Sequence, residues 1–237
     1  MQAHSPAVAA VFEPVHTATT LEETVERLGT AIRLGLLAPG NRLPPERELA
    51  EQLGIARSTL RQALTSLTES GHLVALRGRG GGTFVSESPP LAERSRVQLT
   101  AGHWRDLLDY RVAVEVGTAM LAAERAEPAA LEPLRVHVRT MRHASDFSAY
   151  RRADVFFHLG VAEVAGSPRL VAAMTEIQGK MSELIAHIAH PAPVLARSNE
   201  QHVDLVAALE RHDGCAAVQI VREHLKGTEQ VLAGLMP

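Results

Sequence analysis

The sequence predicts a mostly α-helical protein that begins with a winged helix-turn-helix, made of three helices plus a β-hairpin wing, and ends with an all-α antiparallel helical bundle. Three observations support this fold class. Aromatic residues make up only 3% of the 237 residues while Ala and Leu dominate, which favours helices over sheets. Leucines recur at helical spacing on both sides of Gly54. The composition changes after Pro90, and helical periodicity then continues to the end of the chain.

The domain boundaries follow from the positions of these patterns. The start of the chain is rich in Ala, Thr and Pro and has no hydrophobic pattern, so we expect poor order there. It lacks the basic start and apolar core of a signal peptide, and no apolar run in the chain is long enough to span a bilayer. We therefore expect a cytoplasmic protein without a membrane partner. The expected segments are a disordered N-terminus (1–20), a winged helix-turn-helix (21–86), a linker (87–102) and a helical domain (103–237).

The first expected helix starts at Leu21. Apolar residues follow at helical spacing as far as Ile32, and Leu36 continues the same stripe. Gly35 weakens the end of this helix, and Pro39-Gly40 closes it.

The stretch 43–67 contains the pattern around which the first domain is organised. It predicts two short helices joined by a tight turn, because Gly54 interrupts the leucine spacing and Ile55 can fill the space between the helices. Each helix has one apolar face. The leucines that form these faces are Leu49, Leu53, Leu60, Leu64 and Leu67.

The second of these helices has a polar face that suits the major groove of DNA. Arg57, Ser58 and Arg61 are three and four positions apart, so they point the same way. Guanidiniums can bind phosphates and the edges of guanine bases. The whole chain has a net charge of −3, so it is not a generic basic nucleic-acid binder, and any DNA contact must come from a local patch such as this one.

A β-hairpin with a glycine-rich tip follows. We expect strands at Leu73–Leu76 and Thr83–Val85, joined by a loop over Gly78–Gly82. Glycines let a backbone approach a surface closely, and arginines at such a tip can enter a minor groove. A phosphate-binding loop is excluded because a strand, and not a helix opened by Lys-Ser or Lys-Thr, follows the glycines.

The C-terminal part is predicted to contain six helices. Asp213 is a suitable cap for the last one. The single cysteine, Cys215, excludes an intramolecular disulfide, and we expect it to be a small buried hydrophobic residue. The six helices are expected at about Trp104–Ala126, Pro128–Ala144, Phe147–Ala165, Pro168–His190, Val194–His212 and Gly214–Ala233.

Four residues of the bundle have the chemistry of metal ligands. Asp154 and His158 are one helical turn apart among apolar neighbours, so the pair should face inward. His202 and His224 lie on two later helices. Spacing alone is also compatible with a hydrogen-bonded Asp–His pair and with satisfied core histidines, because a metal site must be confirmed by geometry.

Residues 20–86 resemble the winged helix of GntR-family transcription regulators. The resemblance rests on LAPGNRLPPERELAEQLGIARSTLRQAL followed by the Gly-Arg wing, where helix order, turn and wing all agree. It implies a homodimer that binds double-stranded DNA at a pseudo-palindromic operator. The implied DNA contacts are Arg47, Arg57, Ser58 and Arg61 in the helices and Arg77, Gly78 and Arg79 at the wing.

The C-terminal part resembles the FCD effector domain of the FadR subfamily, in its smaller, VanR-like, six-helix, metal-binding version. The matching segments are Arg111-Val-Ala-Val-Glu115, Asp154-Val-Phe-Phe-His158, Glu200-Gln-His202 and Glu223-His224-Leu225. The resemblance implies a repressor whose operator affinity is controlled by a small carboxylate bound at a metal site. It implies that Asp154, His158, His202 and His224 hold a divalent ion, while Arg111 binds the effector carboxylate. Such ligands suit zinc or nickel, with cobalt, iron or manganese as further candidates.

The sequence departs from the family pattern at two helix starts. The family usually has Ser where this chain has Pro45 and Ala56, so a capping hydrogen bond worth ~1 kcal/mol is expected to be absent at each.

Two of these arginines can also form ordinary ion pairs within their own helices. Arg47 has Glu51 one turn later and Arg111 has Glu115 one turn later, and pairs of this kind stabilise little at a surface.

Two rival functions remain at this point. In the first, the protein is a metal-sensing regulator and the ion itself is the signal. In the second, it is a metal-dependent hydrolase, but the available bases, Glu163 and Glu183, are not placed by any motif, so we predict that the protein is not an enzyme. The remaining histidines are expected to pack near the cavity (His187 and His190) or to lie at the surface (His137, His143 and His212).

Overall fold

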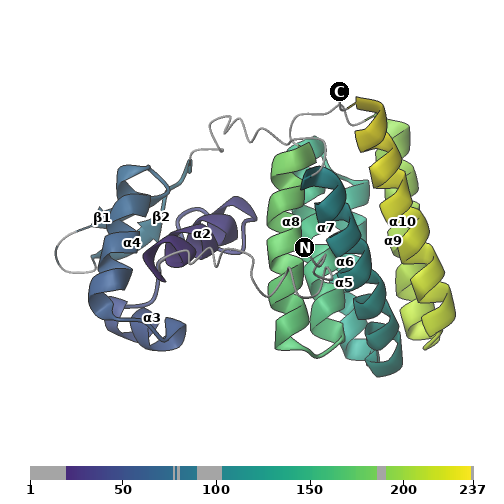
Figure 1. Cartoon of the computed structure of the whole chain (residues 1–237), viewed down its shortest axis with the longest axis horizontal. Helices are drawn as coiled ribbons and strands as arrows, with labels where there is room; N and C mark the ends of the chain where they lie inside the picture. The colour runs from purple at the N-terminus through teal and green to yellow at the C-terminus, as the bar shows by residue number, and fades with distance from the viewer. Residues whose placement is uncertain (1–19, 77, 79–80, 90–102, 186–190, 236–237) are drawn as a thin grey trace, which may run out of the picture. The chain divides into compact units, whose positions relative to one another are not determined.

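The computed structural model describes residues 20–76, 78, 81–89, 103–185 and 191–235. They divide into two compact units. One runs from helix α2 through a two-stranded sheet, and the other holds helices α5 to α10 (Figure 1). The mostly helical fold class and the winged helix-turn-helix are therefore confirmed. The expected disordered segment, apart from Thr20, and the expected linker from residue 90 onward lie outside the described residues.

The first unit contains the three helices and the hairpin that the sequence predicts. Leu36 does not continue the apolar stripe of the first helix, because that helix ends at Arg33 and Leu36 is 37% exposed. The return strand begins one residue earlier than expected, at Gly82. The elements are α2 (Thr20–Arg33), α3 (Glu46–Leu53), α4 (Arg57–Glu69), β1 (Leu73–Leu76) and β2 (Gly82–Val85).

The turn between α3 and α4 has the conformation that the glycine at its centre allows. Gly54 has φ 66°, in the left-handed region, and its N–H donates to the carbonyl groups of Ala50 and Glu51. A residue without Cβ takes this conformation at little steric cost. Ile55 packs, half-buried, against the core formed by the leucines of both helices, so the expected turn is confirmed.

The hairpin is anchored to the helical part by its base. Leu73 pairs with Val85, and each is only 1% exposed, so the first and last residues of the hairpin join the core. The N–H of Leu43 donates to the carbonyl group of Thr83 at 2.8 Å, which ties the segment before α3 to β2.

The described residues of the second unit form a bundle of six helices, as predicted. Asp213 caps the last helix, since its Oδ1 accepts a hydrogen bond from the N–H of Ala216 at 2.9 Å. The fourth helix was expected to reach His190; its described part ends at Ile185, and residues 186–190 lie outside the described residues. The bundle consists of α5 (His103–Arg125), α6 (Pro128–Arg142), α7 (Phe147–Val164), α8 (Pro168–Ile185), α9 (Ala192–Glu210) and α10 (Gly214–Leu235).

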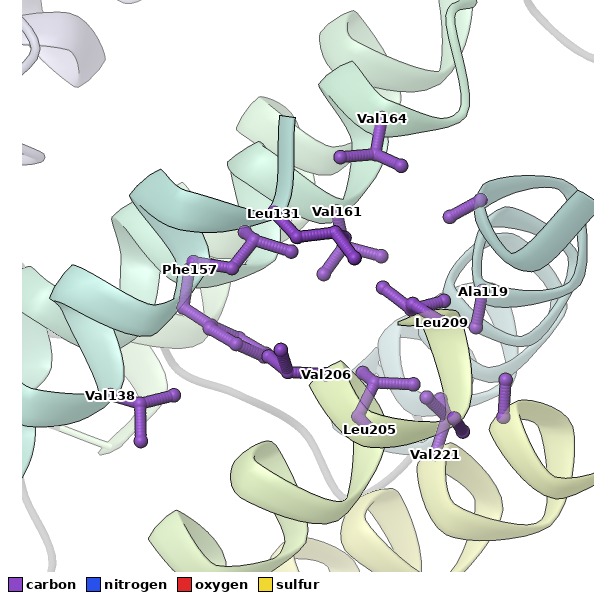
Figure 2. Close-up of a cluster of buried hydrophobic side chains, with 14 of the residues drawn as sticks. Ala119, Leu131, Val138, Phe157, Val161, Val164, Leu205, Val206, Leu209 and Val221 are labelled. Carbon is purple, nitrogen blue, oxygen red and sulfur yellow. The ribbon is translucent and has the colours of Figure 1, made fainter. Parts of the chain in front are cut away.

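Apolar side chains from five of these helices meet in one core (Figure 2). Phe157 of α7, Leu209 of α9 and Ala119 of α5 are fully buried there. The small residue lets neighbouring helices approach closely while the large ones fill the space between them. This core fixes α7, α9 and α10 relative to one another, and these three helices carry the candidate metal ligands. The labelled members are Ala119, Leu131, Val138, Phe157, Val161, Val164, Leu205, Val206, Leu209 and Val221.

One prediction about the bundle is wrong. Cys215 was expected to be buried, but it is exposed, because it lies in the first turn of α10 on the side away from the core residue Ala217. None of the described helices combines the length and the apolar character needed to cross a membrane.

Candidate DNA-binding surface and metal centre

The start of α4 presents the polar face that the sequence predicts. Arg57, Ser58 and Arg61 are all exposed, while the leucines on the other side of the helix are buried. Arg61 is paired across the turn with Glu46 of α3, whose Oε2 accepts from Arg61 Nη2 at 2.9 Å and from Nε at 3.2 Å. This pair gives Arg61 a defined position, whereas no ion pair involving Arg57 occurs among the described residues.

Arg47 forms the pair that its spacing suggests. Its Nη1 lies 3.5 Å from Glu51 Oε1, with 75% of the arginine side chain exposed. An exposed pair of this kind contributes about 0–1 kcal/mol, so DNA can displace it at little cost.

Both helices of the helix-turn-helix start without a side-chain cap. Pro45 precedes α3 and Ala56 precedes α4, and neither accepts a hydrogen bond through its side chain, as the sequence predicts. First-turn N–H groups have no partner within their own helix and, with the helix dipole, favour negative charge. The start of α4 therefore offers backbone donors beside its two arginines.

One arginine outside the hairpin contacts the wing. Arg42 donates from Nη2 to the carbonyl group of Gly81 at 2.6 Å, and its guanidinium lies 5.9 Å from the centre of the Phe84 ring. Gly78 has φ 98°, a conformation that favours glycine. The expected DNA contacts Arg77 and Arg79 lie outside the described residues.

The four candidate metal ligands come together inside the bundle. His158 of α7, His202 of α9 and His224 of α10 each offer a ring nitrogen, and these three nitrogens lie within 4.8 Å of one another. Asp154 Oδ1 lies 3.5 Å from His202 Nε2 and 3.8 Å from His158 Nε2. All four residues are at most 7% exposed.

The donor set fits a divalent metal. His158 Nε2, His224 Nδ1 and both ring nitrogens of His202 are buried without a hydrogen-bond partner among the described residues. A buried polar atom left unpaired costs ~1–3 kcal/mol, so several in one cluster need a physical reason. Three imidazole nitrogens and a carboxylate oxygen at this separation are the ligands that zinc and its neighbours prefer.

Glu115, a residue that sequence reasoning treated only as a partner of Arg111, orients one of these histidines. Its Oε2 lies 2.8 Å from His158 Nδ1. A carboxylate accepts only, so Nδ1 carries a hydrogen, and Nε2 is the ring nitrogen left for the cluster. Burial opposes ionisation of Glu115, but the charges of Arg111 and His158 outweigh it and hold the pKa of Glu115 well below its ordinary value.

The electrostatics of the cluster favour the protonation states that bind metals. Burial lowers the pKa of His202 to about 3 and that of His224 well below its ordinary value, so both imidazoles are neutral near pH 7. Burial alone would raise the pKa of Asp154, but His158 and Arg151 lower it, so Asp154 is ionised. Metal ligands must be deprotonated in this way.

Arg111 is paired with Glu115, as their spacing allows, but the pair is not at the surface. Arg111 Nε lies 2.7 Å from Glu115 Oε1, and the two side chains are 5% and 3% exposed. This contact uses one of the five donors of the guanidinium. Among the described residues, no acceptor is positioned for Arg111 Nη1 or Nη2.

Arg151 is a residue of the site that sequence reasoning missed. It donates from Nη1 to Asp154, from Nε to Ser182 Oγ at 3.1 Å, and from Nη2 to the backbone and side-chain oxygens of Gln178 at 3.0 and 2.8 Å. It therefore holds Asp154 in place from the same helix and ties α7 to α8. Arg151 lies three residues before Asp154, so both are on one helix face, and this spacing could have identified Arg151 from the sequence.

A cavity of about 130 Å³ lies against the metal ligands. Its wall contains two of them, Asp154 and His224, together with three arginines and a mainly apolar remainder. Neither Glu163 nor Glu183 belongs to this wall. A cavity of ~150 Å³ accommodates one molecule of benzene, so the enclosed space suits a ligand of roughly six heavy atoms. The lining residues are Arg111, Phe147, Tyr150, Arg151, Asp154, Met181, Ile185, Val194, Leu195, Arg197, Ser198, Gln201, His224, Gly227 and Thr228.

The other histidines are placed mostly as expected. His143 and His212 are exposed. His137 is half-buried instead of free at the surface, because its ring stacks on Phe156 with 5.6 Å between centroids. His187 and His190 lie outside the described residues.

Two family models match the chain. The model of "Bacterial regulatory proteins, gntR family" matches residues 20–85, and that of the "FCD domain" matches residues 106–227. The chain is 32% identical over 235 residues to a Mycobacterium gastri protein assigned as the HTH-type transcriptional regulator RmpR, covering 95% of this chain and 85% of that protein.

Another relative is an Escherichia coli (strain K12) protein assigned as the L-lactate dehydrogenase operon regulatory protein. It is 32% identical over 217 residues, with 86% of this chain and 83% of that protein covered. Among solved structures, that of E. coli McbR/YncC matches with a TM-score of 0.59 at 20% identity, covering 93% of this chain and all of that one, which supports the fold. Both of these relatives are assigned as regulatory proteins, and neither is assigned as an enzyme.

Proposed function

The chain belongs to the gntR family of bacterial regulatory proteins, with an FCD domain in its C-terminal half, and on that premise we propose that a small carboxylate bound beside a divalent metal ion controls its affinity for an operator. The protein is a transcription regulator of this family. We propose that it acts as a repressor and that it is located in the cytoplasm, where the DNA is. The metal, the effector and the residues that bind them are the parts that need an argument from this chain.

DNA binding is proposed to use the exposed face at the start of α4. Arg57, Ser58 and Arg61 would enter the major groove, and the uncapped N–H groups of the first turn would donate to a phosphate. Arg47 would exchange its weak pair with Glu51 for a phosphate. The wing residues Arg77, Gly78 and Arg79 are proposed as further contacts on the basis of their sequence alone.

A divalent ion is proposed to be held by Asp154, His158, His202 and His224. The support is the set of buried ring nitrogens that have no other partner among the described residues. When bound, the ion supplies a Lewis-acidic position for a ligand oxygen. Zinc or nickel suits three imidazoles and a carboxylate, and cobalt, iron or manganese can use the same donors.

The observation that carries the effector proposal is the state of Arg111. Its side chain is buried and lines the cavity, its Nε is used by Glu115, and no acceptor for its two terminal nitrogens occurs among the described residues. A planar fork with two parallel donors matches a carboxylate group. One relative is assigned as the regulator of an L-lactate dehydrogenase operon, and the size of the cavity suits an acid of that order.

A homodimer is proposed to form through an exposed side of α5. Val112 and Met120 lie eight residues apart on this helix and are 41% and 43% exposed. Gly117 lies on the same side and leaves room for a close approach, since a Cβ there would meet nothing within 4 Å. Two copies would present two recognition helices to half-sites roughly 34 Å apart. Met120→Glu, followed by sedimentation velocity, tests this interface: dissociation to monomers supports it, and an unchanged dimer excludes it.

A thermal-shift screen of small carboxylic acids on zinc-loaded protein tests the function proposed for the cavity. An acid at about 100 times its dissociation constant should stabilise the protein by ~2.7 kcal/mol. Arg111→Lys keeps a positive partner for buried Glu115 but loses the planar fork, so it should abolish the shift without unfolding the domain. Arg169→Gln, an exposed arginine at the start of α8, is the matched control and should leave the shift unchanged.

The screen also separates the proposal from its rival. If no acid shifts the protein while removal of the metal changes both stability and DNA binding, the ion itself is the signal and the protein is a metal-sensing regulator.

A further inference from the structure

The buried charges beside the cavity balance one another only when no metal is bound. The side chain of Arg111 is buried and that of Arg151 is 12% exposed, and their guanidiniums are accompanied by the two buried carboxylates of Glu115 and Asp154. A divalent ion on the histidine cluster therefore adds two positive charges in a region that is almost fully excluded from water. Unbalanced charge is costly at such a place, and an anion in the cavity is the direct way to compensate it.

A third arginine extends this positive region toward the solvent. Arg197 of α9 lines the same cavity but is itself exposed, which places it at the mouth. Among the described residues no acidic group pairs with Arg197, and Asp154 is the only acidic residue in the cavity wall. The cavity thus has cationic groups at its inner end and at its mouth.

The wall between these ends is mainly apolar. Met181 and Ile185 of α8 and Val194 and Leu195 of α9 all contribute to the lining, and the uncharged polar side chains in it are those of Tyr150, Ser198, Gln201 and Thr228. A hydrocarbon segment is the chemistry that such a wall accommodates.

We infer that the effector is a short aliphatic dicarboxylate of about three or four carbons, bound with one carboxylate at Arg111 and the metal site and the other at Arg197. This inference rests on the proposed function, because it assigns a second anionic group to the same effector. Arg197 is accordingly a specificity-determining residue: it selects dicarboxylates over monocarboxylates of equal length. The dicarboxylate's two charges match the two that the ion adds.

Isothermal titration of zinc-loaded protein with matched acids tests the inference. Malonate and succinate are compared with propionate and butyrate, which have the same chain lengths and one carboxylate fewer. The zinc content is measured after each titration, so that extraction of the metal by the dicarboxylates is detected. The variants are Arg197→Gln, which removes the charge at the mouth, and Arg169→Gln, which removes a charge elsewhere on the surface of the bundle.

The wild-type protein and Arg169→Gln are expected to bind at least one dicarboxylate roughly two- to fivefold more tightly than its monocarboxylate partner, the range of an exposed ion pair. In Arg197→Gln this preference should disappear while the affinity for the monocarboxylate stays the same. Monocarboxylates that bind as tightly as dicarboxylates, or a preference that survives Arg197→Gln, would overturn this inference and leave the proposed function intact. Binding of neither class would overturn both.

Discussion

Replacement of Glu115 by Gln is predicted to affect stability and metal affinity together. The Glu115 carboxylate accepts from Arg111 Nε at 2.7 Å and lies 2.8 Å from His158 Nδ1, with the side chain 3% exposed. Glutamine has the same shape but no charge, and its amide group cannot accept from both donors. If the amide N–H faces His158, the ring must accept at Nδ1 and carry its hydrogen on Nε2, where the metal is proposed to bind.

The magnitudes follow from the burial of the pair. A buried guanidinium that loses its partner costs ~3–5 kcal/mol of unfolding free energy. Loss of the group that orients a metal-binding histidine lowers metal affinity by about 10–100-fold. Glu132→Gln is the matched control, because Glu132 also pairs with two arginines, Arg135 at 3.4 Å and Arg139 at 3.0 Å, but its side chain is 57% exposed. Loss of an exposed pair of this kind should change the free energy of unfolding little.

Urea unfolding of chelator-treated protein, followed by circular dichroism, measures the first effect, and competition with a colorimetric zinc chelator measures the second. The free energy of unfolding of Glu115→Gln should be several kilocalories per mole lower than that of Glu132→Gln, and Glu115→Gln should bind zinc more weakly. Equal stability of the two variants would refute the buried charge pair. Unchanged zinc affinity in Glu115→Gln would show that Glu115 does not orient His158.

Three further predictions concern the pH response and the DNA-binding surface. The pKa of His202 is about 3 in the folded protein against an ordinary value of 6.5, so below pH 6.5 the unfolded chain binds a proton that the folded one does not. The free energy of unfolding of the metal-free protein should therefore fall by about 1.4 kcal/mol per pH unit because of this residue as the pH falls from 6.5 toward 3. Urea unfolding at pH 7.5 and pH 5.5 measures this dependence, and His202→Asn should remove the part that His202 contributes. Arg57→Ala should weaken operator binding by ~1–3 kcal/mol if Arg57 contacts a base, or lower the slope of log binding constant against log salt concentration by about one if it contacts a phosphate. Fluorescence anisotropy at several salt concentrations measures both effects. A variant that binds like the wild-type protein would exclude Arg57 from the interface. Glu46→Gln should tighten DNA binding by up to about fivefold, because the surface pair with Glu46, worth at most ~1 kcal/mol, no longer competes with DNA for Arg61. Weaker binding in the same assay would mean that Glu46 positions Arg61 instead.

The fold was predictable from the sequence because its signals are local. Gly54 interrupts a leucine pattern and takes the left-handed conformation that a tight turn needs. Proline and Asp caps marked the starts of bundle helices, and Asp213 caps α10 as its type and position suggest. The errors arose where tertiary packing decides exposure: Cys215 is a residue type that is usually buried, yet it lies in a first turn on the outer side of its helix.

The candidate site was predictable in its ligands but not in its charge balance. The spacing of Asp154 and His158 placed both on one inward face, and the structure brings His202 and His224 to the same point. Sequence spacing also suggested that Glu115 pairs with Arg111, but whether that pair is buried depends on which side of α5 faces α7 and α8. The link from Glu115 to His158 and the contacts of Arg151 with α8 join distant segments, so no local pattern could show them.

The central claim is that one cavity in the C-terminal unit controls operator affinity through a bound acid. Its most direct test is fluorescence anisotropy of a labelled operator duplex, selected from a random-sequence pool, titrated with zinc-loaded protein in the presence and absence of the acid that gives the largest thermal shift. The account predicts a change in operator affinity of roughly 5–150-fold for the wild-type protein and none for Arg111→Lys. Operator affinity that stays constant while the acid occupies the cavity would contradict it.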